Sequence, residues 1–289
     1  MKFSIIIPVF NEEKAIADTI NGVKKIQKRL SGESEIIVVN DGSTDRTLKI
    51  ISKIGGITAI SHDANFGYGK AIKTGTLHSK GKWIIIIDAD TTYPIEDILK
   101  LTGFIGQYDM VVGARTGKNV RIPLSRRPAK WILNKLANYI SSYSIPDLNS
   151  GLRVFKREIA LKFWGLFPDG FSFTTTITVA TICNGYNVKF IPINYYKRKG
   201  KSSIKPSNFL GFTSLIFKLS LFFRPLKIFI PASLILFLFG ILRGIRDFII
   251  TNSLGDLSVI FFLSSLYIFF FGLLAELIVK RTDIRTDLR

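Results

Sequence analysis

The first hundred residues alternate between two patterns, and this alternation constrains the fold more than any other feature. Short β-branched runs at residues 3–10, 34–41, 57–63 and 82–90 are apolar almost throughout, as is typical of strands covered on both faces. The stretches between them carry apolar residues at helical spacing, beginning with residues 11–30. Strand, helix, strand, helix in this order predicts an open, mostly parallel α/β sheet.

The segments after the predicted strands indicate where the helices begin. Asn11 is placed to cap the first helix, with acidic residues in its first turn. Ser43 or Thr44 is placed to cap the second helix, over residues 43–54. A glycine-rich turn at residues 65–71 leads into the third helix and resembles a phosphate-cradling loop, although it lacks the Walker pattern.

Acidic residues occur at three predicted strand ends, where open parallel sheets bind their ligands. Glu12 and Asp41 follow the first two strands, and the stretch "WIIIIDADTTYP" places Asp88 and Asp90 after the fourth. Two carboxylates spaced Asp-x-Asp suit Mg²⁺ or Mn²⁺, because hard cations prefer oxygen ligands and share them with substrate phosphates. Such an ion would neutralise a diphosphate leaving group. Glu12 and Asp41 have a second interpretation, as residues that serve helix starts.

The middle of the chain predicts further strands and one basic helix. Residues 108–116 predict a strand that ends at Arg115, and residues 186–206 predict a last strand followed by a basic loop. Residues 121–144 form a predicted basic amphipathic helix. Two interpretations of this helix can hold together: a surface helix packed on the sheet, or a helix that lies on anionic lipid.

The composition changes after Pro206, where long apolar runs begin. Residues 257–275 are long enough to cross a bilayer, which needs about 20 apolar residues. Residues 228–242 are shorter and need flanking basic side chains to reach the interface. A buried pair of core helices is the alternative, but Phe- and Leu-rich runs of this length need lipid or a very large core. The loop between the two runs is predicted to carry Arg243, Arg246, Asp247 and Asp256.

The chain is both apolar and basic, with 47% hydrophobic residues and a net charge of +19. This combination favours a membrane with an anionic cytoplasmic face. Nucleic acid is the other usual partner of a basic chain, but the basic residues cluster beside apolar helices, so we expect none. The lysine and arginine bias predicts that the catalytic domain and both termini are cytoplasmic. The single cysteine, Cys183, excludes an intrachain disulfide and is expected in the core.

Seven motifs occur in a characteristic order: "SIIIPVFNEE", "EIIVVNDGSTD", "NFGYGKAI", "DADTTYP", "VVGAR", "DLNSGLRVF" and "YYKRKGKSSIKP". Together they resemble the family-2 glycosyltransferases, in the dolichol-phosphate mannose synthase-like, polyprenyl-phosphate glycosyltransferase branch. The resemblance covers roughly residues 1–206. It implies an A-type glycosyltransferase domain with a mostly parallel, Rossmann-like sheet, followed by interfacial helices and two transmembrane helices. The predicted domains are a catalytic domain at 1–205, a juxtamembrane helix at 206–225 and a two-helix anchor with a short tail at 226–289.

The resemblance also implies roles for individual residues. The predicted donor-binding residues are Pro8, Phe10, Glu12, Asp41, Lys70, Asp88, Ala89 and Asp90, with Mg²⁺ or Mn²⁺ held by Asp88 and Asp90. The predicted residues for the acceptor phosphate are Arg115, Arg126, Arg127, Ser150, Arg153, Arg198, Lys201 and Ser202. The predicted catalytic residues are Asp88, Asp90, Arg115 and Asp147. Arginine suits a phosphate site because its planar fork matches phosphate oxygens.

Two departures from the family pattern matter. Thr92 and Tyr93 stand where the mannose synthases more often have a glutamine-histidine pair. The sequence therefore does not determine the donor sugar, or whether the donor nucleotide is UDP or GDP. Residues 170–180 contain no acid where many sugar-acceptor relatives carry a general base. A hydroxyl acceptor must lose a proton during attack, whereas a phosphate acceptor is already an anion. The sequence therefore favours a lipid phosphate over a sugar hydroxyl.

We therefore expect an inverting, metal-dependent transferase that attaches a sugar to dolichyl or undecaprenyl phosphate at the cytoplasmic face of the cytoplasmic or an ER-equivalent membrane. Transfer to a sugar hydroxyl of a glycolipid or glycan is one alternative, and a non-catalytic membrane scaffold is another. The sequence leaves the polyprenol and the oligomeric state open, with a homo-oligomer among the options. His62 and His78 have no second ligand at metal-binding spacing, and we expect structural or surface roles for both.

Overall fold

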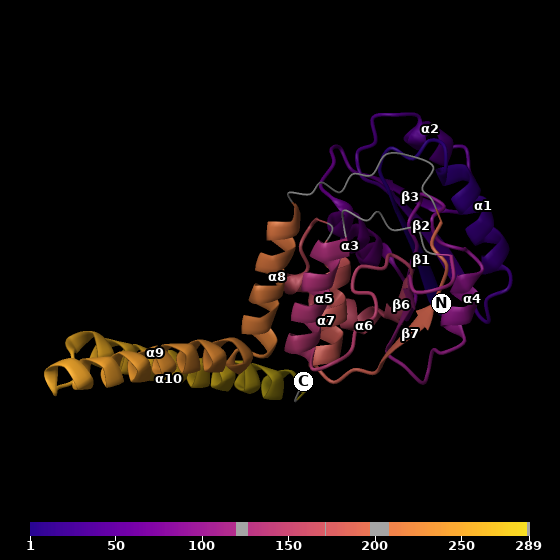
Figure 1. Cartoon of the computed structure of the whole chain (residues 1–289). Helices are drawn as coiled ribbons and strands as arrows, with labels where there is room; N and C mark the ends of the chain where they lie inside the picture. The colour runs from indigo at the N-terminus through magenta and orange to yellow at the C-terminus, as the bar shows by residue number, and fades with distance from the viewer. Residues whose placement is uncertain (120–126, 171, 197–207, 288–289) are drawn as a thin grey trace. The chain divides into compact units, whose positions relative to one another are not determined.

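The computed structural model describes residues 1–119, 127–170, 172–196 and 208–287. The chain divides into two compact units, Met1–Leu215 and Ile216–Arg289. The first unit contains a seven-stranded sheet with helices on it, and the second contains a long helical hairpin (Figure 1).

The sheet has the strand order β3-β2-β1-β4-β6-β5-β7. Its strands are β1 Phe3–Val9, β2 Ser34–Asn40, β3 Thr58–Ser61, β4 Trp83–Ile86, β5 Met110–Ala114, β6 Arg153–Lys156 and β7 Val188–Pro192. Neighbouring strands from β3 to β4 pair in parallel, and so do β5 and β7, which confirms the mostly parallel sheet. Strand β6 pairs antiparallel with both β4 and β5. Because β6 is reversed, the residues before it lie at the same sheet edge as the carboxyl ends of β4 and β5.

The helices of the first unit cover the sheet. They are α1 Ile16–Gln27, α2 Thr47–Ile51, α3 Tyr68–His78, α4 Asp97–Thr102, α5 Arg127–Ser141, α6 Arg157–Lys162 and α7 Phe173–Cys183. Every residue of β1 is buried, and the apolar side of α1, including Ile16, Ile20 and Val23, belongs to the same core cluster. Cys183 ends α7 and is half-buried, so the prediction of a core position is wrong.

Two capping predictions are also wrong. Helix α1 begins at Ile16 rather than directly after Asn11, and α2 begins at Thr47 without a side-chain cap from Ser43 or Thr44. The two loops bind each other instead. The Asn11 backbone N–H donates to Ser43 Oγ (3.0 Å), and Asn11 Oδ1 accepts the Thr44 N–H (2.8 Å). Asn11 has a φ of 55°, in the left-handed region that asparagine tolerates.

Helix α8, Asn208–Phe223, runs across the division between the units, and the hairpin consists of α9 Leu226–Thr251 and α10 Asp256–Asp287. Leu226–Thr251 and Asp256–Lys280 are long and apolar enough to cross a membrane, with mean hydropathies of 2.2 and 2.3. They pack closely: a Cβ at Gly272 would lie 2.5 Å from Phe229 Cβ. The many exposed Phe, Leu and Ile side chains of both helices fit contact with lipid tails.

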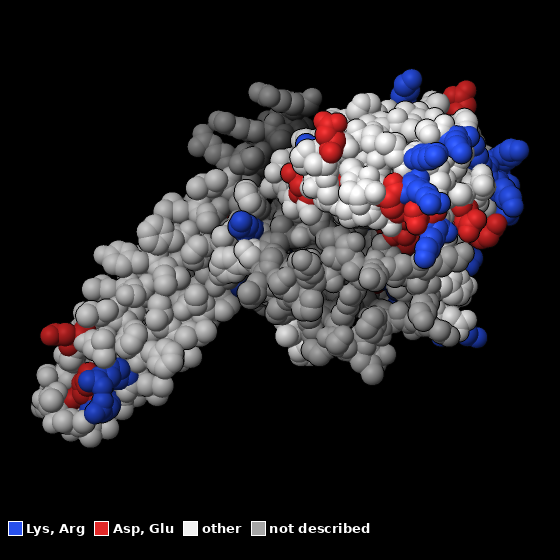
Figure 2. Space-filling view, turned by 90° about the horizontal axis from the view of Figure 1, so that it is seen from above, with Lys and Arg blue, Asp and Glu red and all other residues white. Residues whose placement is uncertain are grey.

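The first apolar helix is longer than the sequence predicted. Arg243, Arg246 and Asp247 lie within α9, so the linker contains only residues 252–255. Charge pairing accounts for the difference, because Arg243 Nε lies 3.2 Å from Asp247 Oδ1, one turn further on. Asp247 Oδ2 also accepts a hydrogen bond from Ser258 Oγ on α10 (2.9 Å). Figure 2 shows basic and acidic side chains together at the linker end of the hairpin.

Candidate active site

The predicted site residues of the first unit gather from separate segments at one edge of the sheet. Asp41 follows β2, Asp88 and Asp90 follow β4, and Arg115 follows β5 directly. Asp147 precedes the reversed β6 and reaches the same edge from the other direction. The fold therefore explains how motifs far apart in the sequence form one site.

Asp88 and Asp90 have defined partners. Tyr68, the first residue of α3, donates its hydroxyl hydrogen to Asp88 Oδ1 (2.9 Å). Asp90 Oδ1 accepts hydrogen bonds from the backbone N–H (3.1 Å) and the hydroxyl (2.6 Å) of Thr92. Between them in the chain, Thr91 has a φ of 58°, a strained value for a β-branched residue. Such strain persists only where the surroundings hold it, and it commonly marks a functional turn.

The residues around Asp88 and Asp90 fit a divalent cation that is shared with a substrate. Among the residues that the structure describes, no group of three or more His, Cys, Asp or Glu side chains could hold a metal by itself. Two carboxylates are hard oxygen ligands that suit Mg²⁺ or Mn²⁺ when phosphate oxygens supply others. Gly151 leaves room for the Asp88 carboxylate, since a Cβ there would lie 2.3 Å from Asp88 Oδ2.

Tyr68 is a neutral donor to this carboxylate. Burial raises the pKa of the Tyr68 phenol well above its ordinary value, and the charge of Asp88 and the hydrogen bond to it raise the pKa further. The phenol therefore keeps its proton at physiological pH and can hold Asp88 in place.

Asp41 holds the glycine-rich turn before α3. Its carboxylate accepts the backbone N–H groups of Phe66 (3.0 Å) and Gly67 (2.8 Å) and is only 3% exposed. His62 Nδ1 lies 2.7 Å from Asp41 Oδ1, and His62 Nε2 lies 2.9 Å from Thr74 Oγ1 on α3. Gly67 has a φ of 106°, which L side chains rarely adopt. The role of Asp41 in donor binding stays a prediction.

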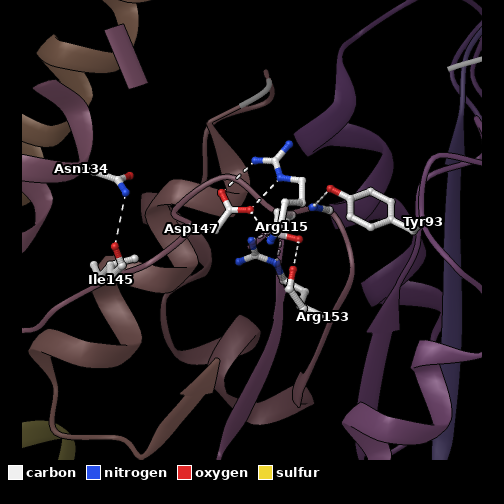
Figure 3. A network of polar contacts seen from close by, with 9 residues as sticks. Tyr93, Arg115, Asn134, Ile145, Asp147 and Arg153 are labelled. Atoms are coloured by element: carbon white, nitrogen blue, oxygen red, sulfur yellow. Dashed lines mark hydrogen bonds and ion pairs between the residues drawn. The ribbon is translucent and has the colours of Figure 1, made fainter. Parts of the chain in front are cut away.

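Arg115 and Asp147 form a buried, two-pronged ion pair (Figure 3). Arg115 Nε donates to Asp147 Oδ2 (2.7 Å) and Nη2 donates to Oδ1 (2.9 Å), while the Arg115 backbone N–H also donates to Oδ2 (2.9 Å). Burial alone lowers the pKa of Arg115, but Tyr93 and Asp147 outweigh it and raise the pKa well above its ordinary value. Arg115 is therefore a fixed cation, and Asp147 sets its direction.

Ser150 and Arg153 have internal partners in the structure. Ser150 Oγ donates to the Gly113 carbonyl, and the Arg153 guanidinium donates to the carbonyls of Ser150 and Thr174 and to Thr178 Oγ1. Both side chains are 0% exposed. Burial lowers the pKa of Arg153 to about 10. Both residues therefore brace the turn before β6, and their contact with the acceptor phosphate stays a prediction.

The other predicted residues divide into three groups. Pro8, Ala89 and Glu12 are buried near the ends of β1 and β4, and Phe10 is half-buried. Lys70 is exposed on α3, and Arg127 is the first residue of α5. The remaining predictions lie outside the described residues: Arg126, Arg198, Lys201 and Ser202.

Four residues with aromatic rings lie at the site but were not among the predicted site residues: His62, Tyr68, Tyr93 and Tyr195. His62 has no sequence signal, because its partner Asp41 lies 21 residues away. Tyr68 and Tyr93 stand inside recognised motifs, but nothing in the spacing shows that Tyr68 reaches Asp88 or that Tyr93 reaches Gly151.

The sheet topology and the residues at its edge define an α/β glycosyltransferase fold. The profile of glycosyl transferase family 2 matches residues 4–164, and the profile of the GtrB C-terminal hairpin matches residues 224–280. The chain therefore belongs to glycosyl transferase family 2 and is a glycosyltransferase.

The similar proteins include transferases whose names describe an activity. A dolichyl-phosphate hexose transferase of Haloferax volcanii is 29% identical over 205 residues, which cover 70% of this chain and 86% of that protein. A bactoprenol glucosyl transferase of Shigella phage SfV is 35% identical over 164 residues, which cover 55% of this chain and 53% of that protein. The match to the phage protein thus spans about half of its length.

A solved structure shares the fold. The glucosyl-3-phosphoglycerate synthase of Mycobacterium tuberculosis, in complex with Mn²⁺, UDP and phosphoglyceric acid, superposes with a TM-score of 0.58 at 17% identity. The match covers 76% of this chain and 78% of that one. At this identity the comparison shows the A-type glycosyltransferase fold alone.

Proposed function

We propose that the protein transfers a sugar, with inversion, from a nucleotide diphosphate to a polyprenyl phosphate at a membrane surface. One observation carries this proposal: a fixed arginine, Arg115, lies at the same sheet edge as the paired carboxylates Asp88 and Asp90. The arginine suits an anionic acceptor, and the paired carboxylates, with a cation, suit a donor diphosphate. The names of the two similar transferases support the same substrate class.

The chemistry of the acceptor side supports a phosphate rather than a hydroxyl. The segment where a general base would be expected forms the start of α7, where Thr174, Thr175 and Thr176 are buried. Thr175 Oγ1 lies 2.5 Å from Asn149 Oδ1, so this part of α7 packs against the turn before β6. A phosphate oxygen needs no base, because it already carries charge at neutral pH.

The residues then have separate tasks in the reaction. A phosphate oxygen of the lipid attacks the anomeric carbon as the bond to the nucleotide diphosphate breaks. Asp147 holds Arg115 toward the acceptor, so the positioning of an anion contributes to the rate. Asp88 and Asp90 would hold Mg²⁺ or Mn²⁺, which when bound offsets charge on the departing diphosphate. Pro8, Phe10, Glu12, Asp41, Lys70 and Ala89 would line or support the nucleotide pocket.

The C-terminal helices would keep the site at the height of lipid headgroups. We assign residues 1–205 to catalysis, 206–225 to a juxtamembrane helix and 226–289 to the anchor. The catalytic domain and both termini would lie in the cytoplasm, because the lysine and arginine bias favours that side. The basic segment with Arg198, Lys201 and Ser202 and the residues Arg126 and Arg127 would add contacts to the acceptor phosphate.

Product analysis tests this function. Purified full-length protein is incubated with UDP- and GDP-sugars, Mg²⁺ or Mn²⁺, and undecaprenyl or dolichyl phosphate, and the mass of the lipid product is measured. We expect one sugar added to the lipid phosphate, and no product with EDTA. Parallel reactions offer free and lipid-linked sugars. Product only in those reactions would replace the proposed acceptor with a sugar hydroxyl.

A matched variant separates catalysis from a scaffold role. Asp90→Asn keeps an oxygen that can accept the Thr92 hydrogen bonds but removes the charge. Loss of a preorganised electrostatic contact commonly costs ~100-fold or more in rate. We expect a loss of this size with an unchanged melting temperature. Equal activity of Asp90→Asn and wild type would contradict the role of the paired carboxylates.

A further inference from the structure

The two halves of the site come from different parts of the chain. Asp88 and Asp90 form the donor half on the turn after β4, while Arg115 and Asp147 form the acceptor half. Transfer requires reacting atoms held about 3–3.5 Å apart before the bonds change. The contacts that join the halves therefore decide whether two bound substrates can react.

Tyr93 makes the first of these contacts. Its hydroxyl oxygen accepts the backbone N–H of Gly151 at 2.7 Å, and its side chain points toward the segment beside Arg115 (Figure 3). Gly151 also lies against Asp88, since a Cβ there would be 2.3 Å from Asp88 Oδ2. The backbone of Gly151 is thus held by the Tyr93 hydroxyl and lies against the Asp88 carboxylate.

The ring of Tyr93 makes the second contact. It packs edge-on against Tyr195, with ring centroids 5.1 Å apart, and the Arg115 guanidinium lies 5.1 Å from the centroid of the same Tyr195 ring. The backbone adds a further link, because the Tyr196 N–H donates to the Thr92 carbonyl at 2.9 Å. Tyr93 therefore reaches Arg115 through Tyr195 and reaches Asp88 through Gly151.

The environment of the Tyr93 phenol reflects this position. Burial raises its pKa, the charge of Arg115 opposes the shift, and the charges of Asp88 and Asp147 add to it. The phenol is neutral at physiological pH, so its oxygen serves as a hydrogen-bond acceptor without adding a charge beside a diphosphate.

We propose that Tyr93 is a positioning residue that couples the donor half to the acceptor half and so directs the sugar to the lipid phosphate rather than to water. This inference rests on the proposed function. In transfer, the bond from the anomeric carbon to the diphosphate breaks and a bond to the lipid phosphate oxygen forms. In hydrolysis, a water oxygen takes that place and its proton passes to solvent. Weakening the contacts between the two halves of the site leaves donor binding intact, but it raises the fraction of donor sugar that is transferred to water.

The test compares two tyrosine variants of the full-length protein in detergent. Tyr93→Phe removes only the oxygen that accepts the Gly151 N–H. Tyr143→Phe is the matched control, because the Tyr143 hydroxyl donates to the Val188 carbonyl (3.2 Å), at the start of β7 and away from the paired carboxylates. The substrates are the nucleotide sugar and the polyprenyl phosphate that give most product with wild type. In each reaction the sugar lipid measures transfer and the free sugar measures hydrolysis. Binding of UDP and GDP with Mn²⁺ is measured by calorimetry.

For Tyr93→Phe we expect a transfer turnover reduced at least tenfold, a ratio of hydrolysis to transfer raised at least fivefold, and nucleotide affinity within threefold of wild type. Tyr143→Phe should match wild type in all three. An unchanged ratio in Tyr93→Phe overturns the coupling role, and so does a loss of nucleotide affinity as large as the loss of turnover. A merely structural role would lower the melting temperature without moving the ratio.

A second variant keeps the inference testable if Tyr93→Phe does not fold. Tyr195→Leu removes the ring between Tyr93 and Arg115 at a half-buried position and leaves the Gly151 contact in place. Tyr195→Leu should also raise the ratio of hydrolysis to transfer. A ratio equal to that of wild type would overturn the coupling role of Tyr93. Wild-type protein that makes no sugar lipid with any pair overturns the proposed function itself, a result distinct from active wild type with unaffected variants.

Discussion

At the scale of single residues, His62 shows how a side chain without a motif can organise a site. It lies between Asp41 and Thr74 and is mostly buried, whereas His78 is exposed on α3, with Nδ1 near the carbonyl of Thr74. Asp41 in turn holds the glycine-rich turn that leads to Tyr68. His62 is therefore linked to Asp88 through three contacts: His62 with Asp41, Asp41 with the glycine-rich turn, and Tyr68 with Asp88.

We predict that His62→Ala destabilises the protein and His78→Ala does not. The first change removes a hydrogen bond to the buried Asp41 carboxylate, which lowers the free energy of unfolding by about 1.5–3 kcal/mol. The second changes an exposed contact and should stay within about 0.5 kcal/mol. Thermal or denaturant unfolding of both variants measures the difference. Equal effects of the two substitutions would show that the Asp41 contact contributes nothing.

At the scale of elements, Asp45 replaces the expected cap of α2. Asp45 Oδ1 accepts the Thr47 N–H (2.9 Å), and Oδ2 accepts the Glu13 N–H (3.2 Å). Partial burial alone raises the pKa of Asp45, but the hydrogen bonds from Thr47 and Glu13 prevail and hold it below the ordinary 3.8. One carboxylate thus starts the helix and joins it to the loop after β1.

The lowered pKa gives a prediction for acid. A carboxyl group with a lowered folded pKa adds stability above its unfolded pKa, and this stability is lost as the pH falls through the folded value. Asp45→Asn should therefore be less stable than wild type at neutral pH, by about 1 kcal/mol or less. The difference should shrink as the pH falls below 3.8. Urea unfolding between neutral and acidic pH measures it, and a constant difference at all pH values would contradict the argument.

Much of the sheet could be predicted from the sequence, because a strand buried on both faces is a short, almost continuous run of apolar, β-branched residues. The run 84–87 is four isoleucines, and the acids that follow it fall at the strand end as expected. The reversed strand β6 could not be predicted, since "RVFK" is too short to show its direction. Its direction comes from antiparallel pairing with both β4 and β5, and it brings Gly151, just before β6, within reach of the Tyr93 hydroxyl.

The hairpin shows a related gap between pattern and structure. In the sequence the apolar run 228–242 stops at the charged Arg243, which makes it short for a membrane span. The helix continues because Arg243 and Asp247 pair within it and Ser258 completes the contact from α10. Length alone therefore underestimates a helix whose charges are paired.

This cluster makes a prediction for the hairpin. Ser258→Ala removes the donor to Asp247 Oδ2 and should cost about 0.6 kcal/mol, the average for a hydrogen bond between membrane helices. Asp247→Leu should cost more, because it leaves the Arg243 charge without its partner. Unfolding of the full-length protein in SDS and mild detergent measures both, with Ser264→Ala on the same helix as control. A larger effect of Ser258→Ala than of Asp247→Leu would contradict this order.

At the scale of the whole molecule, the chain joins a family-2 glycosyltransferase domain to an apolar hairpin. In the proposed arrangement the two helices both cross the membrane, which would return the chain to its starting side and leave the catalytic domain and the C-terminal tail on one side. The linker between the spans, residues 252–255, contains no lysine or arginine, whereas the tail from Lys280 onward contains four. By the positive-inside rule we therefore expect the linker outside.

Cysteine labelling tests this orientation directly, because the chain has a single native cysteine. In a Cys183→Ser background, Ser253→Cys places a thiol in the linker and Ser52→Cys places one at an exposed position after α2. A membrane-impermeant maleimide applied to intact cells should label the Ser253→Cys protein and should label the Ser52→Cys protein only after permeabilisation. Labelling of both in intact cells would place the catalytic domain outside, and labelling of neither would show that the hairpin does not cross the membrane.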